Sequence, residues 1–241
     1  VSFDTRVDVG TGATLSLTGT EASAGEFALR ADNRLNAVDS VSFTTGGALS
    51  GARTDSVVKT TQDKATVAIG PGARLTSPGD IALSARGGGS VSTATNADTY
   101  GVATVAVATS RSEIRPVNLV SIGAGAQVVA TGSVLASTGT DTNFNRDVYA
   151  LKARTDTFAG SAIPIDSVDS DADLISDNRI IVAAGAVVES AKDIKLHAER
   201  FGFGTMESRA KAVNWASAAA SAINSALGGS ENYAGDVKTE C

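Results

Sequence analysis

IGPGARL, at residues 69–75, is the stretch that decides the fold, because the chain repeats it. The same phrase reads VGTGATL at 9–15, IGAGAQV at 122–128 and VAAGAVV at 182–188. Its second glycine falls at positions 12, 72, 125 and 185, so the spacings between successive copies are 60, 53 and 60. Repeats of this length indicate a stacked array of units rather than a domain built around one unique core.

A second phrase follows each copy of the first. It reads GEFALRA at 25–31, GDIALSA at 79–85, GSVLAS at 132–137 and KDIKLHA at 192–198, and GDV at 235–237 resembles the start of a fifth copy. Two phrases that recur in the same order define about four imperfect modules, roughly 7–64, 65–118, 119–179 and 180–241. We therefore expect 1–241 to be a single continuous body, as a segment of a longer chain.

The stretches between glycines alternate in polarity with a period of two, which predicts β-strands. Residues 65, 67 and 69 share one face of such a strand, as do residues 81, 83 and 85, and the same pattern runs through 101–109. The Ala-rich segment 208–227 has helical propensity. Because it occupies the place that 102–107 hold in the second module, strand is favoured there, and a helix would be a cap or a side appendage.

Equivalent strands of successive modules are expected to stack in register as parallel strands, which gives an all-β, right-handed parallel β-helix (a β-solenoid). With about 18 to 28 residues in a coil, each module would make two or three coils. At roughly 4.8 Å per coil, the segment would be a rod about 40 to 60 Å long.

The paired phrases, each followed by an Ala-, Gly- and Ser-rich strand, resemble the repeats of filamentous-haemagglutinin-like and autotransporter-passenger-like bacterial adhesins, whose shafts are right-handed parallel β-helices. The resemblance covers about Val7 to Val237, and its motifs specify architecture rather than activity. It implies an extracellular or cell-surface location and a role in adhesion, matrix or filament formation. It supplies no catalytic residues to carry over.

Composition excludes several classes of partner and site. The net charge is −6, with 26 acidic and 20 basic residues, which argues against binding to nucleic acid. No apolar run is long enough for a membrane-spanning helix, so membrane insertion is not expected. The single cysteine, Cys241, rules out a disulfide framework and a thiolate metal site.

An acidic stretch is the one candidate for a metal site. Asp169, Asp171 and Asp173 are spaced i, i+2, i+4, as at the start of a calcium-binding loop, and Asp166 and Asp177 lie close by. The glycine and the bidentate glutamate that such a loop requires are replaced by Leu174 and Ile180. The alternative interpretation is the solvated outer face of a strand, and no other cofactor is expected.

Other candidate residues have simpler structural interpretations. His197 occupies an outward strand position, and Gly87 to Gly89 is interpreted as a flexible turn rather than a phosphate loop. The aromatic residues beside predicted loops include Tyr100, Phe144 and Tyr149, which would either contact sugar rings or pin loops against the coil. Trp215 is interpreted as a packing residue, with a ligand-binding platform as the alternative.

The sequence thus predicts a non-enzymatic structural or adhesive shaft of a large exported bacterial surface protein. Its partners would be neighbouring coils of the same longer chain, with end-to-end self-association and host or surface glycans as further partners. Two alternatives stay open. One is a self-assembling extracellular filament or matrix subunit, and the other is a carbohydrate-binding or polysaccharide-cleaving β-helix.

Overall fold

The computed structural model describes residues 2–19, 25–199, 203–214, 232–233 and 236–240, and the regular elements in this part of the chain are all β-strands. Sheet A contains β1 (Ser2–Val9), β5 (Gln62–Ile69), β8 (Pro116–Ile122) and β12 (Asp177–Val182), in that order. Sheet B contains β2 (Thr14–Ser16), β6 (Arg74–Ser77), β9 (Gln127–Ala130) and β13 (Val187–Ser190).

The third sheet, sheet C, contains the long strands. Its members are β3 (Phe27–Gly46), β4 (Leu49–Lys59), β7 (Ile81–Ile114), β10 (Val134–Thr138), β11 (Val148–Ile175), β14 (Ile194–Ala198), β15 (Phe203–Asn214), β16 (Asn232–Tyr233) and β17 (Asp236–Glu240). The strand pairings in the three sheets are parallel, apart from the short antiparallel pair of β15 and β16. An all-β, solenoid-like fold of parallel strands is therefore confirmed.

The register shows that one repeat makes one coil. In sheet A, Val9 pairs with Ile69, Ile69 with Ile122 and Ile122 with Val182, which reproduces the spacings of the repeated phrase. The expectation of two or three short coils in each module is therefore wrong, and so is the rod length built on it. Sheets A and B are four strands deep, or about 15 Å. Long strands in sheet C take up the residues that extra coils were expected to use.

The repeated glycine phrase forms the corner between sheets A and B. In each copy the fifth residue of the phrase donates its backbone N–H to the carbonyl of the second across 3.1 Å, as Ala73 does to Gly70. The intervening glycine has positive φ in every copy, 67° at Gly72. This is the geometry of a type II turn, which favours proline before the glycine, as Pro71 provides. Corners also bond to one another, because Gly72 donates to the Ala124 carbonyl at 2.9 Å.

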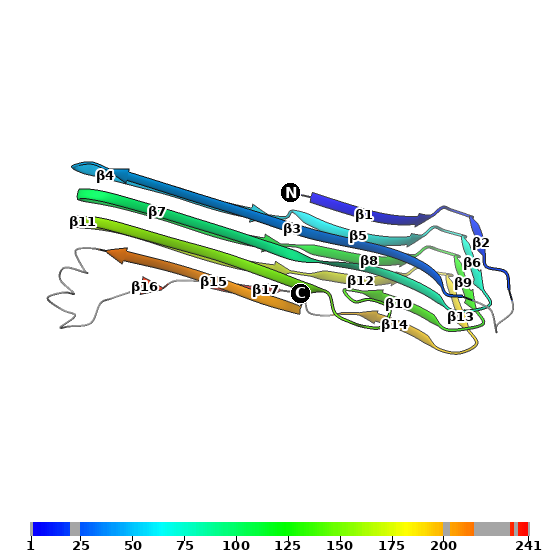
Figure 1. Ribbon diagram of the computed structural model, residues 1–241. Coiled ribbons are helices and arrows are strands. Elements are labelled where there is room, and N and C mark those ends of the chain that lie inside the picture. The colour runs from blue at the N-terminus through cyan, green and yellow to red at the C-terminus, as the bar shows by residue number, and fades with distance from the viewer. Residues whose placement is uncertain (1, 20–24, 200–202, 215–231, 234–235, 241) are drawn as a thin grey trace.

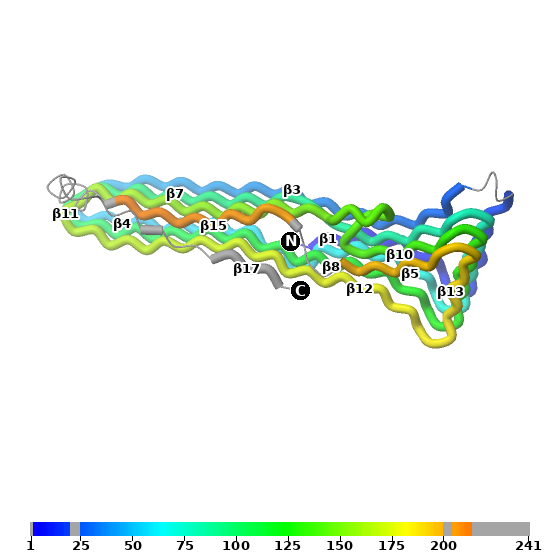
Figure 2. The backbone as a smooth tube through the Cα atoms, turned by 90° about the horizontal axis from the view of Figure 1, so that it is seen from below, coloured from blue at the N-terminus to red at the C-terminus, as the bar shows by residue number. Residues whose placement is uncertain are grey.

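Each coil has a three-sided end and a long flat arm (Figures 1 and 2). The three sheets surround the end, and the long strands of sheet C run out from it to form the arm. β7 reverses near Gly101, where a Cβ would overlap the carbonyl oxygen of Gly47 in the neighbouring coil. As a result Thr93 on the outgoing half faces Ser112 on the returning half, with their hydroxyls 3.0 Å apart. A 20-residue strand such as β3 extends about 65 Å.

The interior changes along the coil. The three-sided end holds the main apolar core, which includes Ile69, Leu75, Leu83, Ile122 and Val128. The predicted inward faces at 65, 67 and 69 and at 81, 83 and 85 are buried, as the alternation required. A smaller cluster lies at the base of the arm, and a third cluster further out in the arm consists of alanines alone.

The Ala-rich segment is described only in part. Residues 208–214 belong to β15, which confirms the strand prediction for that stretch. Residues 215–227 lie outside the described residues.

No helix long and apolar enough to cross a membrane occurs in the described part of the chain.

Candidate functional site

Sheet C is interrupted at the boundary between the three-sided end and the arm. Along β7, Ile81 pairs with Val134, which lies 53 residues further along the chain. Gly89, in the same strand, pairs with Tyr149, which lies 60 residues further along. The additional residues belong to the loop 139–147, which leaves the sheet and returns to it.

The loop is a compact turn built around one carboxylate. Asp141 accepts hydrogen bonds from the backbone N–H groups of Asn143 and Asn145, at 2.8 and 2.9 Å, and from the Asn145 side chain at 2.9 Å. Arg146 donates to Glu199 at 2.9 Å. The loop is therefore ordered by its own side chains and tied to the next coil.

Asp147 closes the gap that the loop leaves in the sheet. Its carboxylate accepts a hydrogen bond from the backbone N–H of Gly87 at 2.7 Å, where a paired strand would have presented a carbonyl. Gly87 to Gly89 therefore lie within β7, and the prediction of a flexible turn is wrong. Gly89 has a φ of 153° and no room for a side chain, because a Cβ there would overlap the backbone of Leu35. Close strand approach, rather than a turn, requires glycine here.

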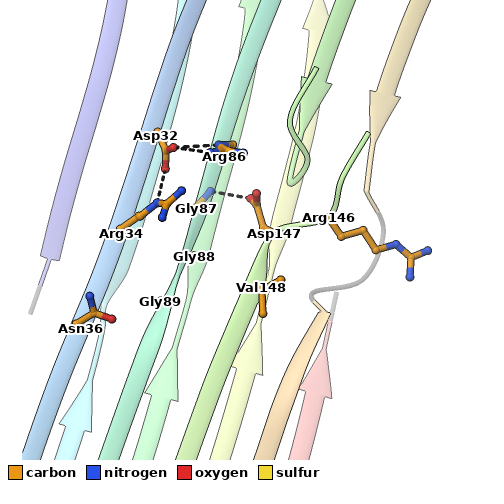
Figure 3. A pocket seen from close by; sticks show the side chains of 10 residues that line it. All are labelled: Asp32, Arg34, Asn36, Arg86, Gly87, Gly88, Gly89, Arg146, Asp147 and Val148. Atoms are coloured by element: carbon orange, nitrogen blue, oxygen red, sulfur yellow. Dashed lines mark hydrogen bonds and ion pairs between the residues drawn. The ribbon is translucent and has the colours of Figure 1, made fainter. Parts of the chain in front are cut away.

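A hollow of about 330 Å³ lies on the outer face over these glycines (Figure 3). Asp32 and Arg34 of β3 form one wall, Arg86 of β7 lies at one end, and Arg146 and Asp147 form the opposite wall. Asp32 accepts two hydrogen bonds from Arg86, at 3.0 and 2.8 Å, and lies 3.5 Å from the Arg34 guanidinium. Two arginines therefore share one carboxylate.

A second hollow, of about 380 Å³, adjoins the first along the same strands. Both are lined by Asp32 and Arg86, and the second also by Arg30, Ser84 and the Asp141 end of the loop. The two hollows lie on either side of the Asp32–Arg86 pair and make one extended surface that follows β3 and β7.

Behind this surface lies a layer of buried polar side chains that separates the two apolar clusters. Asn33 donates to Asp63 at 2.6 Å, and Asn118 donates to Asn178 at 2.7 Å. Tyr149 is buried with its hydroxyl against Gly87, where a Cβ would approach it to 2.7 Å. Gly87 therefore leaves the space that the Tyr149 ring needs.

Burial shifts the acid–base behaviour of this layer. It raises the pKa of Asp63 to about 6 and the pKa of Asp147 to about 7. Burial also raises the pKa of Tyr149, with the nearby Asp147 and Asp63 carboxylates adding to the effect. The cause is the cost of keeping a charge away from water. The arrangement can thus hold a proton near neutral pH.

The predicted calcium ligands lie along β11 and are not drawn together. Asp169 accepts a hydrogen bond from the backbone of Ser170 at 2.9 Å, and Asp173 accepts one from Arg111 at 2.9 Å. Among the described residues no group of three or more His, Cys, Asp and Glu is placed to hold a metal ion. Calcium binding stays a prediction, which a calcium titration of thermal stability would test, with Asp171→Asn as the variant. Asp166, expected nearby, has instead an inward position, where burial raises its pKa.

The aromatic candidates are used in different ways. Tyr100 contacts Phe158 near the end of the arm, with ring centroids 5.6 Å apart, and Phe144 contacts His197 edge-on at 5.1 Å. His197 is half-exposed, as its outward position predicted. Tyr149 lies beside the loop 139–147, as expected, but its ring is buried in the core and is not available to contact a sugar ring. Trp215 lies outside the described residues.

Sequence reasoning missed Asp63, Asp147 and the asparagines around them. One signal was present: Asn33 and Asn118 occupy inward positions of their strands, in the same alternating rows as Leu35 and Val120. A polar residue at an inward position of an alternating strand marks a buried polar contact.

Comparison of the chain with models of known protein families, with curated proteins and with solved structures finds no match in any of the three.

Proposed function

We propose that the chain is a non-enzymatic structural or adhesive shaft segment of a large exported bacterial surface protein. It is a right-handed solenoid of four imperfect modules and is displayed outside the cell or on its surface. The observation that carries the proposal is the in-register parallel pairing of equivalent strands from successive repeats. Because every coil offers its neighbour the same row of backbone groups, further coils can be added without a new kind of contact.

The two ends of the stack support this proposal. At one end Val182, Ile194 and Leu196 are about half exposed, although the equivalent residues of the preceding coil are buried. At the other end Leu15 is partly exposed, whereas its partner Leu75 is fully buried. An apolar row that continues to an uncovered edge is suited to burial under another coil of the same longer chain.

A concatemer tests whether such stacking continues. Ile175 pairs with Glu240, so a residue added at position 242 would pair with Asp177. Across sheet A, Asp177 is in register with Asp4 of β1. Fusing Cys241 directly to Asp4 of a second copy therefore places β1 in register. We expect one cooperative transition with a Tm several degrees above that of the single chain, because a new interface is buried. Two independent transitions at the single-chain Tm would overturn the proposal.

Val7 provides a matched control in the concatemer. It is an inward residue of β1 that lies at the free edge in the first copy and at the joint in the second. Val7→Asp in the second copy should remove the gain in Tm, and the same change in the first copy should retain most of it.

The second candidate is a filament or matrix subunit that joins by strand addition, which the open apolar edges at both ends also favour. It predicts concentration-dependent fibres in electron micrographs of the single chain. Val182→Pro in the edge strand β12 should abolish them, because the backbone N–H of Val182 lies on the open edge, whereas that of the next residue, Ala183, donates to Ile122 of β8. Fibres that persist in this variant would exclude pairing through β12.

A further inference from the structure

Three buried oxygens in the polar layer behind the hollows have no hydrogen-bond partner. They are Asp63 Oδ2, Asn118 Oδ1 and the Tyr149 hydroxyl, and each of these residues is at most 2% exposed. Within the residues that the structure describes, no lysine, arginine or histidine forms an ion pair with Asp63, whose other carboxylate oxygen accepts a hydrogen bond from the neutral side chain of Asn33. A buried charge is normally paired or bound to a metal ion. The layer therefore has more acceptor oxygens than donors to satisfy them.

The hydrogen bonds around the layer fix where two of these oxygens point. Asn178 donates its side-chain N–H to the Glu199 carbonyl at 2.8 Å, so its side-chain oxygen accepts from Asn118 at 2.7 Å. An amide has one donor end and one acceptor end, so Asn118 turns its own oxygen away from Asn178 and into the layer. Asn33 donates to Asp63 Oδ1 at 2.6 Å, which leaves Oδ2 for another partner.

These groups meet in the space beside Gly87. A Cβ at Gly87 would lie 2.7 Å from the Tyr149 hydroxyl and 3.7 Å from Asn118 Oδ1, so both oxygens border the volume that the missing side chain leaves. Gly87 pairs in sheet C with Asn33, which holds Asp63 at the same level of the coil. A carboxylate and an amide from sheet A and a phenol from sheet C therefore converge on one place.

We propose that Asp63, Asn118 and Tyr149 bind a hard metal cation, sodium or calcium, at the boundary between the three-sided end and the arm. Such ions prefer oxygen ligands, among them carboxylates and amide carbonyls. One cation satisfies several acceptor oxygens and balances the Asp63 charge, whereas the single proton of the Tyr149 hydroxyl can satisfy one acceptor. The ion joins sheet A to sheet C close to the point where sheet C is interrupted. The site has a single acidic ligand and is separate from the acidic stretch on β11.

Thermal unfolding of the whole chain at pH 8 tests the proposal. At this pH Asp63 is ionised, because its pKa is about 6. After treatment with a chelator, the chain is unfolded in choline chloride, in sodium chloride and in choline chloride with calcium, all at the same ionic strength. We expect sodium or calcium to raise the Tm by several degrees, because an ion that binds the folded state stabilises it. A rise with one of the two identifies the ion, and equal Tm values in all three solutions would overturn the proposal.

Carboxylate-to-amide variants locate the site. Asp63→Asn keeps the size of the side chain and removes its charge, so it should remove the cation-dependent rise in Tm. Asp171→Asn is the matched control, because Asp171 lies on β11 in the acidic stretch where the sequence predicts calcium ligands, and it should retain the rise. A rise that persists in Asp63→Asn, or one that Asp171→Asn removes, would overturn the site.

A second pair of variants covers the case in which Asp63→Asn does not fold. Tyr149→Phe keeps the buried ring and removes the hydroxyl, so it should weaken cation binding about tenfold in a calorimetric titration. Tyr100→Phe, at a half-exposed tyrosine near the end of the arm, should leave the affinity unchanged. Equal affinities in the two variants would overturn the site. The proposal does not depend on the shaft function, and the concatemer measures stacking at the ends of the chain, so the two can fail separately.

Discussion

The three-sided end and the arm belong to the same coils, yet their interiors are built from different residues. Ile69, Leu75 and Ile122 fill the end, where three sheets surround a wide space. The arm has two layers, and its interior consists largely of alanine, serine and threonine, including Ala97 and Ala108. The number of enclosing sheets thus sets the size of side chain that fits between them.

Hydroxyl groups replace apolar bulk in the arm. Thr95 donates across the two layers to the Thr109 carbonyl at 2.8 Å. Ser110 and Ser112 donate to the carbonyls of Arg154 and Lys152 in the next coil, at 2.7 and 2.8 Å. Serine and threonine side chains are short, so these hydrogen bonds form only where the two layers lie close together. The end is therefore held mainly by apolar burial, and the arm mainly by backbone pairing and short polar contacts.

The largest expected effect is the loss of a large residue from the three-sided end. Ile122→Ala should lower the free energy of unfolding by about 4 kcal/mol, because a buried cavity remains. Ile181→Ala, which lies outward on the neighbouring strand β12, is the matched control and should cost less than about 1 kcal/mol. Chemical denaturation measures both. Equal costs would show that the end is not the apolar core of the coil.

The polar layer between the two regions should make stability depend on pH. Asp63 has an ordinary pKa of 3.8 and a folded pKa of about 6, so the folded state binds its proton more tightly. Its stabilising effect is therefore present at low pH and is lost as pH rises through about 6, at a cost of about 3 kcal/mol. Asp147 should add a second loss near pH 7.

Asp63→Asn should flatten the part of this profile below about pH 6.5 and raise stability at pH 8. Asp55→Asn, an exposed carboxylate in the arm, should leave the profile unchanged. Thermal unfolding across pH 4 to 8 measures the effect, and a wild-type profile that rises between pH 5 and 8 would contradict it.

Overpacking should be costly in the arm because its layers are close. Ala108→Leu should lower the free energy of unfolding by about 2 kcal/mol, since the extra atoms have no space between the layers. Ala124→Leu, exposed at a corner turn, makes the same change outside and should cost little. If both variants are equally stable, the arm interior is wider than the hydroxyl contacts indicate.

The parts of this architecture that the sequence predicted are those with a local signature. Gly72 after Pro71 specifies a corner, and apolar residues at 65, 67 and 69 specify an inward face. Coil length has no such signature, because alternation looks the same in a short strand such as β10 and in a long one such as β3. The arm interior also resembles a surface when read as sequence, since Thr95 and Ser110 are polar and yet buried.

The candidate site was hidden for a related reason. Asp147 follows an irregular loop, and its role depends on which backbone group the loop leaves without a strand partner. Gly87 is distant from it in sequence and has no alternation pattern of its own. Only the register of β7 against β10 and β11 brings them together.

The smallest expected effect concerns apolar residues on the outside of the arm. Leu49 is 82% exposed and Ile163 and Ile165 are each 60% exposed, close to where the strands reverse. Leu49 and Ile163 flank Ala103 in one row, so they form a patch across three coils. Because an exposed residue gains little from folding, Ile165→Ser should change the free energy of unfolding by less than about 0.5 kcal/mol.

The same substitution should reduce self-association, which light scattering measures, because apolar patches on a surface favour contact between molecules. A loss of several degrees in Tm would instead show that another element covers this face. Isoleucine would then stabilise the arm as Ile122 stabilises the end, and the contrast between the two regions would not hold. An unchanged Tm, set beside the loss expected for Ile122→Ala, places the apolar stabilisation of the coil in the space enclosed by three sheets.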